Sequence, residues 1–381
     1  VAAHEGSLGH TIGPTWRKFS SAAMAYQNLR LLPLSLFAAF GDTIGIAARY
    51  GDGGGKMAFQ AFTQGLRDVY ARWKDAASDM PAERTKTMWE NIAEMVGAVD
   101  SHMFLEQMGK AHTSEFTTDW ARKANRALFM ANGLTAWDRS MRVSATKAAV
   151  LFLQHHAAEP DKTHSTRWLK ELGLKASDIP LDAEGNLIYD RHVLAAEKGL
   201  SLEDATKQAE KVHYAITRWV EGAVLTPTAG QRPTWASDPH YAVLFHLKQF
   251  TYSFHHTILK RAYTEAGHGN MSPIGALMAA VPTMVAADLV KGVLLGGGSL
   301  PAYMQPWDLG DHLMHGASRA GTTGIWQFGI DGLRDPLSVM GPAVEQIATT
   351  VFNPSDIAQN ALNAVPGLRS IGGLKDMARA A

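Results

Sequence analysis

Apolar residues recur at three- and four-residue steps through most of this chain, and this spacing constrains the fold more than any other feature. The clearest run follows Pro81, a residue type favoured in the first turn of a helix, and comprises Met88, Ile92, Met95, Val96, Val99 and Met103. Strand-like alternation occurs only near Gly185 and Asn186, where residues 187–189 predict one short hairpin edge. We therefore predict an all-α protein, an extended array of short and medium helices with little or no β-structure.

Glycine and proline divide the predicted helices of the first part of the chain. The apolar segment from Trp16 to Ala48 is interrupted by Pro33 and by glycines at positions 41 and 45, which predicts two short helices. A glycine-rich run at 51–55 then precedes a helix that starts near Lys56. This run resembles a phosphate-binding loop only superficially, because the pattern G-x-x-x-x-G-K-[ST] is absent.

Two further helices are predicted on either side of Gly133. One spans Ser114–Asn132, with Gly133 as its left-handed end. The next begins at Thr135, where Asp138 three residues later makes an approximate capping box. Its expected apolar face carries Trp137, Met141, Ala145, Ala148 and Leu151, and its expected polar face carries Arg139, Arg142 and Lys147.

Composition divides the chain into four predicted segments. Residues 1–80 form an apolar helical segment, and residues 81–177 form an amphipathic helical bundle. Residues 178–239 combine an acidic insertion, a helix from Leu202 to about Leu225 and a proline-rich connector. Residues 240–381 form a C-terminal helical region, which opens with a long helix over 240–265 and contains an apolar stretch at 273–295.

The charge balance argues against a classical nucleic-acid-binding protein. Lysine and arginine together number 36, as do aspartate and glutamate, so no net charge supports strong binding along a phosphate backbone. Charged residues make up only 19% of the chain, below the roughly one quarter usual for soluble domains. We therefore expect partners or lipid to cover part of its surface. The absence of cysteine excludes disulfides and thiolate metal sites.

No sequence motif indicates catalysis. Sixteen histidines are present, but the adjacent pairs at 155–156 and 255–256 point about 100° apart on a helix and cannot supply two convergent ligands. Neither H-E-x-x-H nor G-x-S-x-G occurs. We therefore predict no catalytic, cofactor-binding or metal-binding residues, although a pair of carboxylates distant in sequence remains open.

A set of basic residues is a candidate contact for nucleic-acid phosphates or anionic lipid. The set is Arg122, Lys123, Arg126, Arg139, Arg142 and Lys147. The competing interpretation is a solvated helix face, because Asp138 stands four residues before Arg142, the spacing of an ordinary intrahelical ion pair.

The stretch from Pro273 to Leu295 is long enough to cross a bilayer. Asp288 and Lys291 stand three residues apart on one face, and each costs about 2.5–3.5 kcal/mol at the bilayer centre unless it is paired or faces protein. A buried core helix is the alternative. If the stretch meets lipid or another subunit, the candidate contacts are Leu277, Met284, Asp288, Lys291 and Leu294.

Five landmarks, taken in order, resemble the C-terminal region of the very large internal virion proteins of short-tailed phages, also called DNA-ejection proteins. None is specific alone, but together they span most of the chain. They are the apolar segment Leu29–Asp42, the unit Phe129–Arg139, the run Arg218–Thr228 leading to Arg232 and Pro233, the unit Phe245–Tyr252, and Arg319–Gly324 with Gly341 and Pro342.

The resemblance implies a structural, non-enzymatic role. Such proteins are packed in the virion interior, leave through the tail and assemble across the host periplasm and inner membrane as a tunnel for viral DNA. It implies a homo-oligomer, contacts with other ejection, tail or portal proteins, and DNA that passes without sequence-specific binding. A stand-alone membrane-associated pore or remodelling protein is one alternative, and an unrecognised murein hydrolase is another.

Overall fold

The computed structural model describes residues 39–76, 86–99, 133–161, 164–225, 249–295 and 304–319, with a few shorter stretches. Within these ranges the chain is helical and has no β-strand, which confirms the predicted all-α class. The α-helices are α3 (Asp42–Tyr50), α4 (Gly54–Ala76), α5 (Met88–Met95), α8 (Leu134–Ala158), α9 (Ser165–Glu171), α10 (Arg191–Lys198), α11 (Leu202–Glu221), α13 (Gln249–Phe254), α14 (Lys260–Gly267), α15 (Ser272–Leu295) and α16 (Leu309–Arg319).

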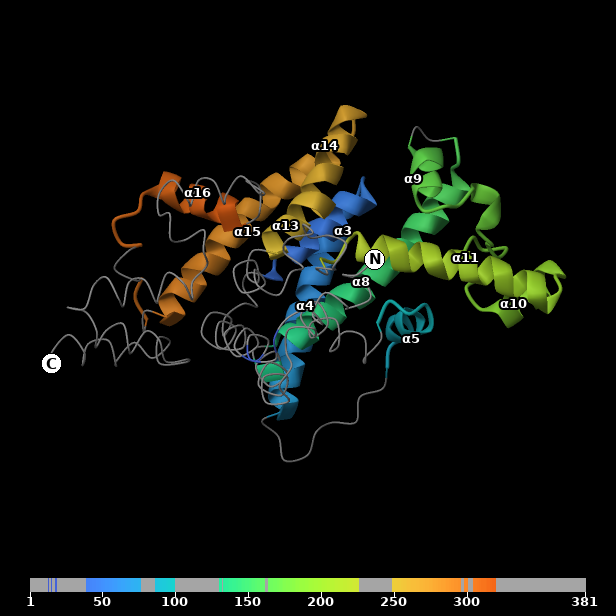
Figure 1. Cartoon of the computed structure of the whole chain (residues 1–381), viewed down its shortest axis with the longest axis horizontal. Helices are drawn as coiled ribbons and strands as arrows, with labels where there is room; N and C mark the ends of the chain where they lie inside the picture. The colour runs from blue at the N-terminus through green and yellow to red at the C-terminus, as the bar shows by residue number, and fades with distance from the viewer. Residues whose placement is uncertain are drawn as a thin grey trace.

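Helices α4 and α8 pack along each other at the centre of the molecule, and α3, α5 and α11 pack against one or both of them (Figure 1). Helices α9, α10 and α11 form one end, while α15 and α16 extend toward the other. The main hydrophobic core runs from Ala39 to Ala287 and takes buried residues from all four predicted segments. The segments therefore contribute to a common core.

The apolar face of α8 anchors this core. Trp137 is fully buried, and its ring lies 5.0 Å from that of Phe40 and 5.9 Å from that of Phe62. Gly65 of α4 packs directly on it, since a Cβ atom there would lie 2.7 Å from Trp137 and 2.8 Å from Met141. The predicted face of α8 is confirmed except at its last position, Leu151, which is only half-buried.

Gly45 acts differently from the sequence prediction, whereas Gly133 has the predicted left-handed backbone. Gly45 does not interrupt a helix but lies inside α3, because its missing side chain lets α3 contact the backbone carbonyl of Ala223. Gly133 does adopt a left-handed backbone, with φ of 78°, and also directly precedes α8. No side chain caps α8, so the predicted capping box of Thr135 and Asp138 is wrong.

Three predicted boundaries also change. Helix α5 ends at Met95 rather than near Met103, since Gly97 has φ of 75° and turns the chain. Helix α11 begins at Leu202 as predicted and ends at Glu221. The expected hairpin edge is reduced to one isolated bridge between Leu181 and Leu187.

The predicted helix over 240–265 is described from residue 249, where α13 and α14 continue through a π-helical turn at His255–Leu259. The predicted connector at 226–239 lies outside the described residues. So do the segment 16–38, except position 18, and most of the predicted helix Ser114–Asn132.

Candidate functional site

Helix α15 has two apolar faces, one buried against the rest of the chain and one exposed. Leu277, Val281, Met284 and Ala287 are buried against the rest of the chain. The opposite face exposes Met278, Val290 and Val293, whose exposed fractions are 65%, 49% and 37%. Two of the predicted lipid or subunit contacts, Leu277 and Met284, are thus used inside the chain. The side chain of Leu294 lies outside the described residues.

This exposure distinguishes α15 from an ordinary core helix. Its segment Ser272–Val293 has the length and composition to cross a membrane, and only 22% of its most apolar part is buried in the chain. A core helix would bury most of its surface, whereas a helix that meets lipid or a second protein keeps an apolar face available. In Figure 1 α15 runs away from the central helices and is accompanied by α16.

The charged residues of α15 lie on its half-buried flank. Asp288 forms an ion pair with the imidazole of His315 on α16, a partner that the sequence spacing did not suggest. Gly316 allows this approach, since a Cβ atom there would collide with Val285. The ring of Trp307 packs against His315 at 4.9 Å. Asp288 is thus partly neutralised by a neighbouring helix, which lowers its cost in an apolar setting.

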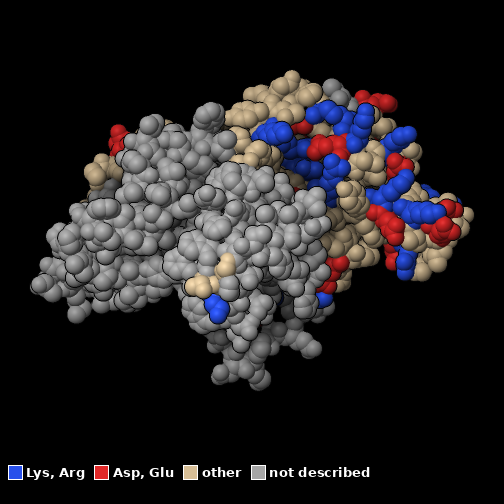
Figure 2. All heavy atoms as spheres, viewed as in Figure 1, with Lys and Arg blue, Asp and Glu red and all other residues tan. Residues whose placement is uncertain are grey.

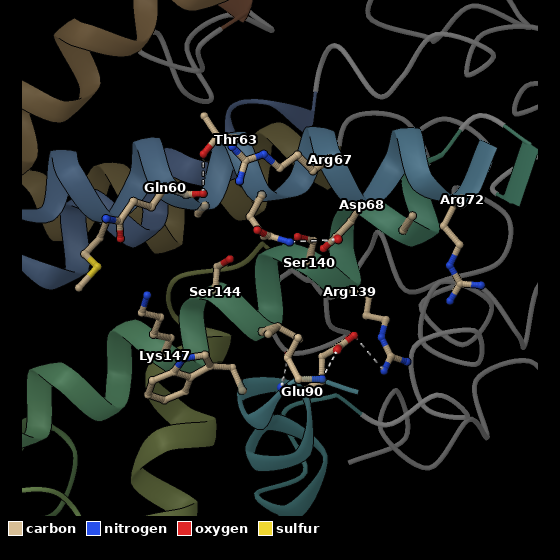
Figure 3. A pocket seen from close by; sticks show the side chains of 17 residues that line it. Gln60, Thr63, Arg67, Asp68, Arg72, Glu90, Arg139, Ser140, Ser144 and Lys147 are labelled. Atoms are coloured by element: carbon tan, nitrogen blue, oxygen red, sulfur yellow. Dashed lines mark hydrogen bonds and ion pairs between the residues drawn. The ribbon is translucent and has the colours of Figure 1, made fainter. Parts of the chain in front are cut away.

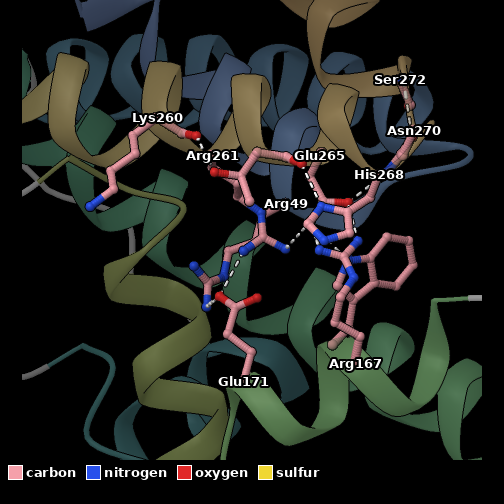
Figure 4. Close-up of polar contacts among 11 residues, drawn as sticks. Arg49, Arg167, Glu171, Lys260, Arg261, Glu265, His268, Asn270 and Ser272 are labelled. Carbon is pink, nitrogen blue, oxygen red and sulfur yellow. Dashed lines mark hydrogen bonds and ion pairs between the residues drawn. The ribbon is translucent and has the colours of Figure 1, made fainter.

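A network of charged side chains closes the junction of α9 and α14 (Figure 4). Glu265 of α14 is almost fully buried and accepts two hydrogen bonds from Arg167 of α9, at 2.9 and 2.7 Å. It also accepts hydrogen bonds from Trp168 Nε1 and Asn270 Nδ2, each at 3.1 Å. Burial opposes ionisation, but these donors outweigh it and lower the pKa of Glu265 to about 2.

The same network reaches α3 through Arg49. Glu171 of α9 accepts a hydrogen bond from Arg261 at 2.7 Å and forms a 3.4 Å ion pair with Arg49. Burial and the neighbouring Arg261 charge lower the pKa of Arg49 to about 9. Gly222 is needed beneath it, because a Cβ atom there would overlap the guanidinium. The junction therefore joins three helices by ion pairs formed within the chain.

The predicted basic face is largely engaged inside the protein where it is described. Arg142 is buried, not exposed as predicted, because it donates a 2.8 Å hydrogen bond to Asp138 and a 3.4 Å hydrogen bond to the carbonyl of Ala98. Arg139 forms a 2.9 Å ion pair with Glu94. Arg122, Lys123 and Arg126 lie outside the described residues. In Figure 2 charged side chains of both signs are interspersed over α9, α10 and α11.

Lys147 and Arg139 instead belong to a hollow of about 310 Å³ between α4, α5 and α8 (Figure 3). Arg67 and Arg72 of α4 lie on its opposite wall. The sequence analysis missed these two arginines, because their partners in the hollow come from helices distant in the chain. No local motif marks such a set.

No known protein family, curated protein or solved structure is detectably similar to this chain. Among the described residues, no group of three or more histidines and carboxylates is placed to hold a metal ion. His156, one of the adjacent histidines, is buried and shares a 2.9 Å hydrogen bond with Ser165. The function has to be argued from the surfaces of the chain.

Proposed function

We propose that this chain is a structural virion protein of a short-tailed phage, ejected into the host envelope. There it forms part of an oligomeric conduit for genome delivery across the periplasm and inner membrane. The observation that carries the proposal is the exposed apolar face of α15, formed by Met278, Val290 and Val293. Exposed apolar faces of this kind mark contacts with lipid or with another subunit.

Other exposed apolar side chains support assembly. On α4, Phe59 and Tyr70 are each 68% exposed, and Trp73 is 45% exposed. On α16, Leu309 and Met314 are also largely exposed. Aromatic and methionine side chains are enriched among residues that become buried between subunits.

The charge balance suits a conduit. DNA held by many lysine and arginine contacts releases counterions and binds tightly at low salt, which would retard its passage. This chain carries no net charge, and each arginine of the junction between α3, α9 and α14 forms an ion pair with a carboxylate inside the protein. A wall built from such subunits would let DNA slide without sequence-specific binding.

The proposal is tested by reconstituting the purified chain into liposomes of inner-membrane composition. We expect it to float with the liposomes, to form an oligomer of defined mass and to let an encapsulated short DNA duplex escape. A chain that stays monomeric in detergent and in liposomes, with no release of DNA, contradicts the proposal.

The exposed face of α15 also suits the alternative of a stand-alone membrane pore or remodelling protein. That alternative predicts leakage of small solutes or deformation of the liposomes while the DNA duplex is retained. Turnover of purified murein by this chain alone would instead support the hydrolase alternative. The three readouts separate the three functions in one set of preparations.

A further inference from the structure

The hollow between α4, α5 and α8 carries an excess of positive charge. Four cationic side chains line it, namely Arg67, Arg72, Arg139 and Lys147, against the two carboxylates Asp68 and Glu90. Among the described residues, only Arg139 of these four has carboxylate partners, at 2.9 Å from Glu94 and 3.8 Å from Glu90. The hollow therefore offers cations from two different helices to an anion.

The other three cations have no carboxylate partner among the described residues. Within the same residues, the side chains of Arg67 and Arg72 form no ion pair or hydrogen bond. Lys147 lies over the ring of Trp89, 5.9 Å from its centroid, and forms no ion pair there. Figure 3 shows α4, with Arg67 and Arg72, facing α8, with Lys147. Cations that lack an internal partner beside a hollow are suited to an external anion.

A buried hydroxyl on the α8 side points to the same conclusion. Ser140 lines the hollow, is only 3% exposed, and its Oγ atom has no hydrogen-bond partner. A buried hydroxyl without a partner costs free energy, and an acceptor placed in the hollow would remove that cost. One turn further along α8, Ser144 adds a second hydroxyl to the wall. Both hydroxyls can donate to the oxygens of an anion.

We propose that this hollow binds the phosphate group of a nucleotide, either free or as one unit of a nucleic-acid strand. Arginine forks and serine hydroxyls match the oxygens of a phosphate. Trp89 and the amide of Gln60 also line the hollow, and these are groups on which a base can stack or form hydrogen bonds. The site would exist whether or not the chain assembles in a membrane.

A lipid headgroup is the less favoured source of phosphate. Helix α15 is the described helix with the length and composition to enter a bilayer, and it contributes no residue to the lining of the hollow. The volume of about 310 Å³ lies at the lower end of the range for small-molecule sites, which suits a mononucleotide.

The test measures the binding of radiolabelled deoxyadenosine monophosphate to the full chain in solution. Equilibrium dialysis without lipid is the method. Inorganic phosphate and a short oligothymidylate serve as competitors, and anionic phosphatidylglycerol vesicles serve as a separate arm. The variants are Arg72→Gln, which removes an unpaired charge, and Ser140→Ala, which removes the buried hydroxyl. Arg191→Gln is the matched control, since Arg191 is exposed on α10 and does not line the hollow.

We expect saturable binding that falls about five- to twentyfold in Arg72→Gln and in Ser140→Ala, with Arg191→Gln unchanged. Ser140→Ala should keep or raise the melting temperature, because the Oγ atom of Ser140 forms no hydrogen bond within the protein. If Ser140 were needed only for the fold, the variant would lose both binding and melting temperature. Competition by oligothymidylate identifies a strand as the source, and its failure identifies a free nucleotide. No saturable binding, an equal loss in Arg191→Gln, or variant-sensitive binding of vesicles alone overturns the proposal.

Discussion

Helix α14 contacts α9 through charged side chains and α15 through apolar side chains. The junction with α9 is charged and closed, because Glu265 is buried and receives hydrogen bonds from Arg167, Trp168 and Asn270. The contact with α15 is apolar and one-sided, because α15 buries Leu277 and leaves its opposite face exposed. The ion pairs of the junction form within one chain. Helix α15 keeps an apolar face exposed, and under the proposed function this face is the one that a partner or lipid covers.

The largest effect should follow removal of the charge at the closed junction. In Glu265→Gln the half-buried Arg167 loses its carboxylate while Arg261 keeps Glu171, and removing one partner of a buried ion pair typically costs about 3–5 kcal/mol. The free energy of unfolding from urea titration measures this loss. Glu203→Gln is the control, since the Glu203–Lys207 pair is exposed on α11 and should contribute less than about 0.5 kcal/mol. Equal losses in both variants would show that the junction is not special.

The junction should also make the protein sensitive to acid. The pKa of Glu265 is lowered to about 2 in the folded protein, so its contribution to stability is fully present above its unfolded pKa near 4.3. That contribution, on the order of 2–3 kcal/mol, is lost as the pH falls from there toward 2. Unfolding measured between pH 6 and 3 should be less pH-dependent in Glu265→Gln. If the loss of stability between pH 6 and 3 is the same in Glu265→Gln as in the parent, other carboxylates cause the acid sensitivity.

Helix α3 has a buried carboxylate, Asp42, at the end opposite to Arg49, and its pKa shifts in the opposite direction to that of Glu265. Arg49 is paired at the junction, whereas Asp42 is buried and its Oδ1 atom has no hydrogen-bond partner. Burial, with the nearby Asp138 charge, raises the pKa of Asp42 well above its usual value. A raised carboxyl pKa stabilises the fold at low pH and destabilises it as the pH rises through the folded pKa.

Asp42→Asn should therefore stabilise the protein by about 1–2 kcal/mol at pH 8 and by less at pH 4. Melting temperatures at both pH values measure the difference. A larger gain at pH 4 than at pH 8 would contradict the assigned ionisation of Asp42.

The ion pair between α15 and α16 should contribute least. The sequence spacing suggests Lys291 as a partner of Asp288, and the structure adds an ion pair with His315 on α16. A double-mutant cycle of Asp288→Leu with His315→Leu should give a coupling of about 1 kcal/mol. The same cycle with Lys291→Leu should give a smaller value. A larger coupling with Lys291 would show that Lys291, as the sequence spacing suggests, is the main partner of Asp288.

The features that sequence could predict are local. The buried face of α8 follows from apolar spacing around Trp137, and α15 spans Ser272–Leu295, close to the predicted 273–295, because few charges interrupt it. The contacts that sequence could not predict join distant parts of the chain. Arg167 and Glu265 are 98 positions apart, and no local spacing relates them.

Glycine was a further source of error, because its role depends on what packs against it. Gly45 and Gly65 lie inside helices and permit close approach, whereas Gly97 ends a segment with a left-handed backbone. The sequence alone does not distinguish these roles. The hollow lined by Arg67, Arg72 and Ser140 was not predicted either, because its walls come from helices that are distant in the chain.

The central claim is that the exposed face of α15 drives assembly, and a single charge on that face tests it most directly. Met278→Glu places a carboxylate on a residue that is 65% exposed, so folding should change by less than about 0.5 kcal/mol. Met88→Glu is the matched control, because Met88 is 58% exposed on α5.

The measurement is the mass of the complex and its flotation with liposomes for the parent and both variants. We predict that Met278→Glu remains folded by circular dichroism but neither forms the oligomer nor floats, while Met88→Glu behaves like the parent. If Met278→Glu assembles and binds liposomes as the parent does, the exposed face of α15 has no part in assembly and the account is contradicted.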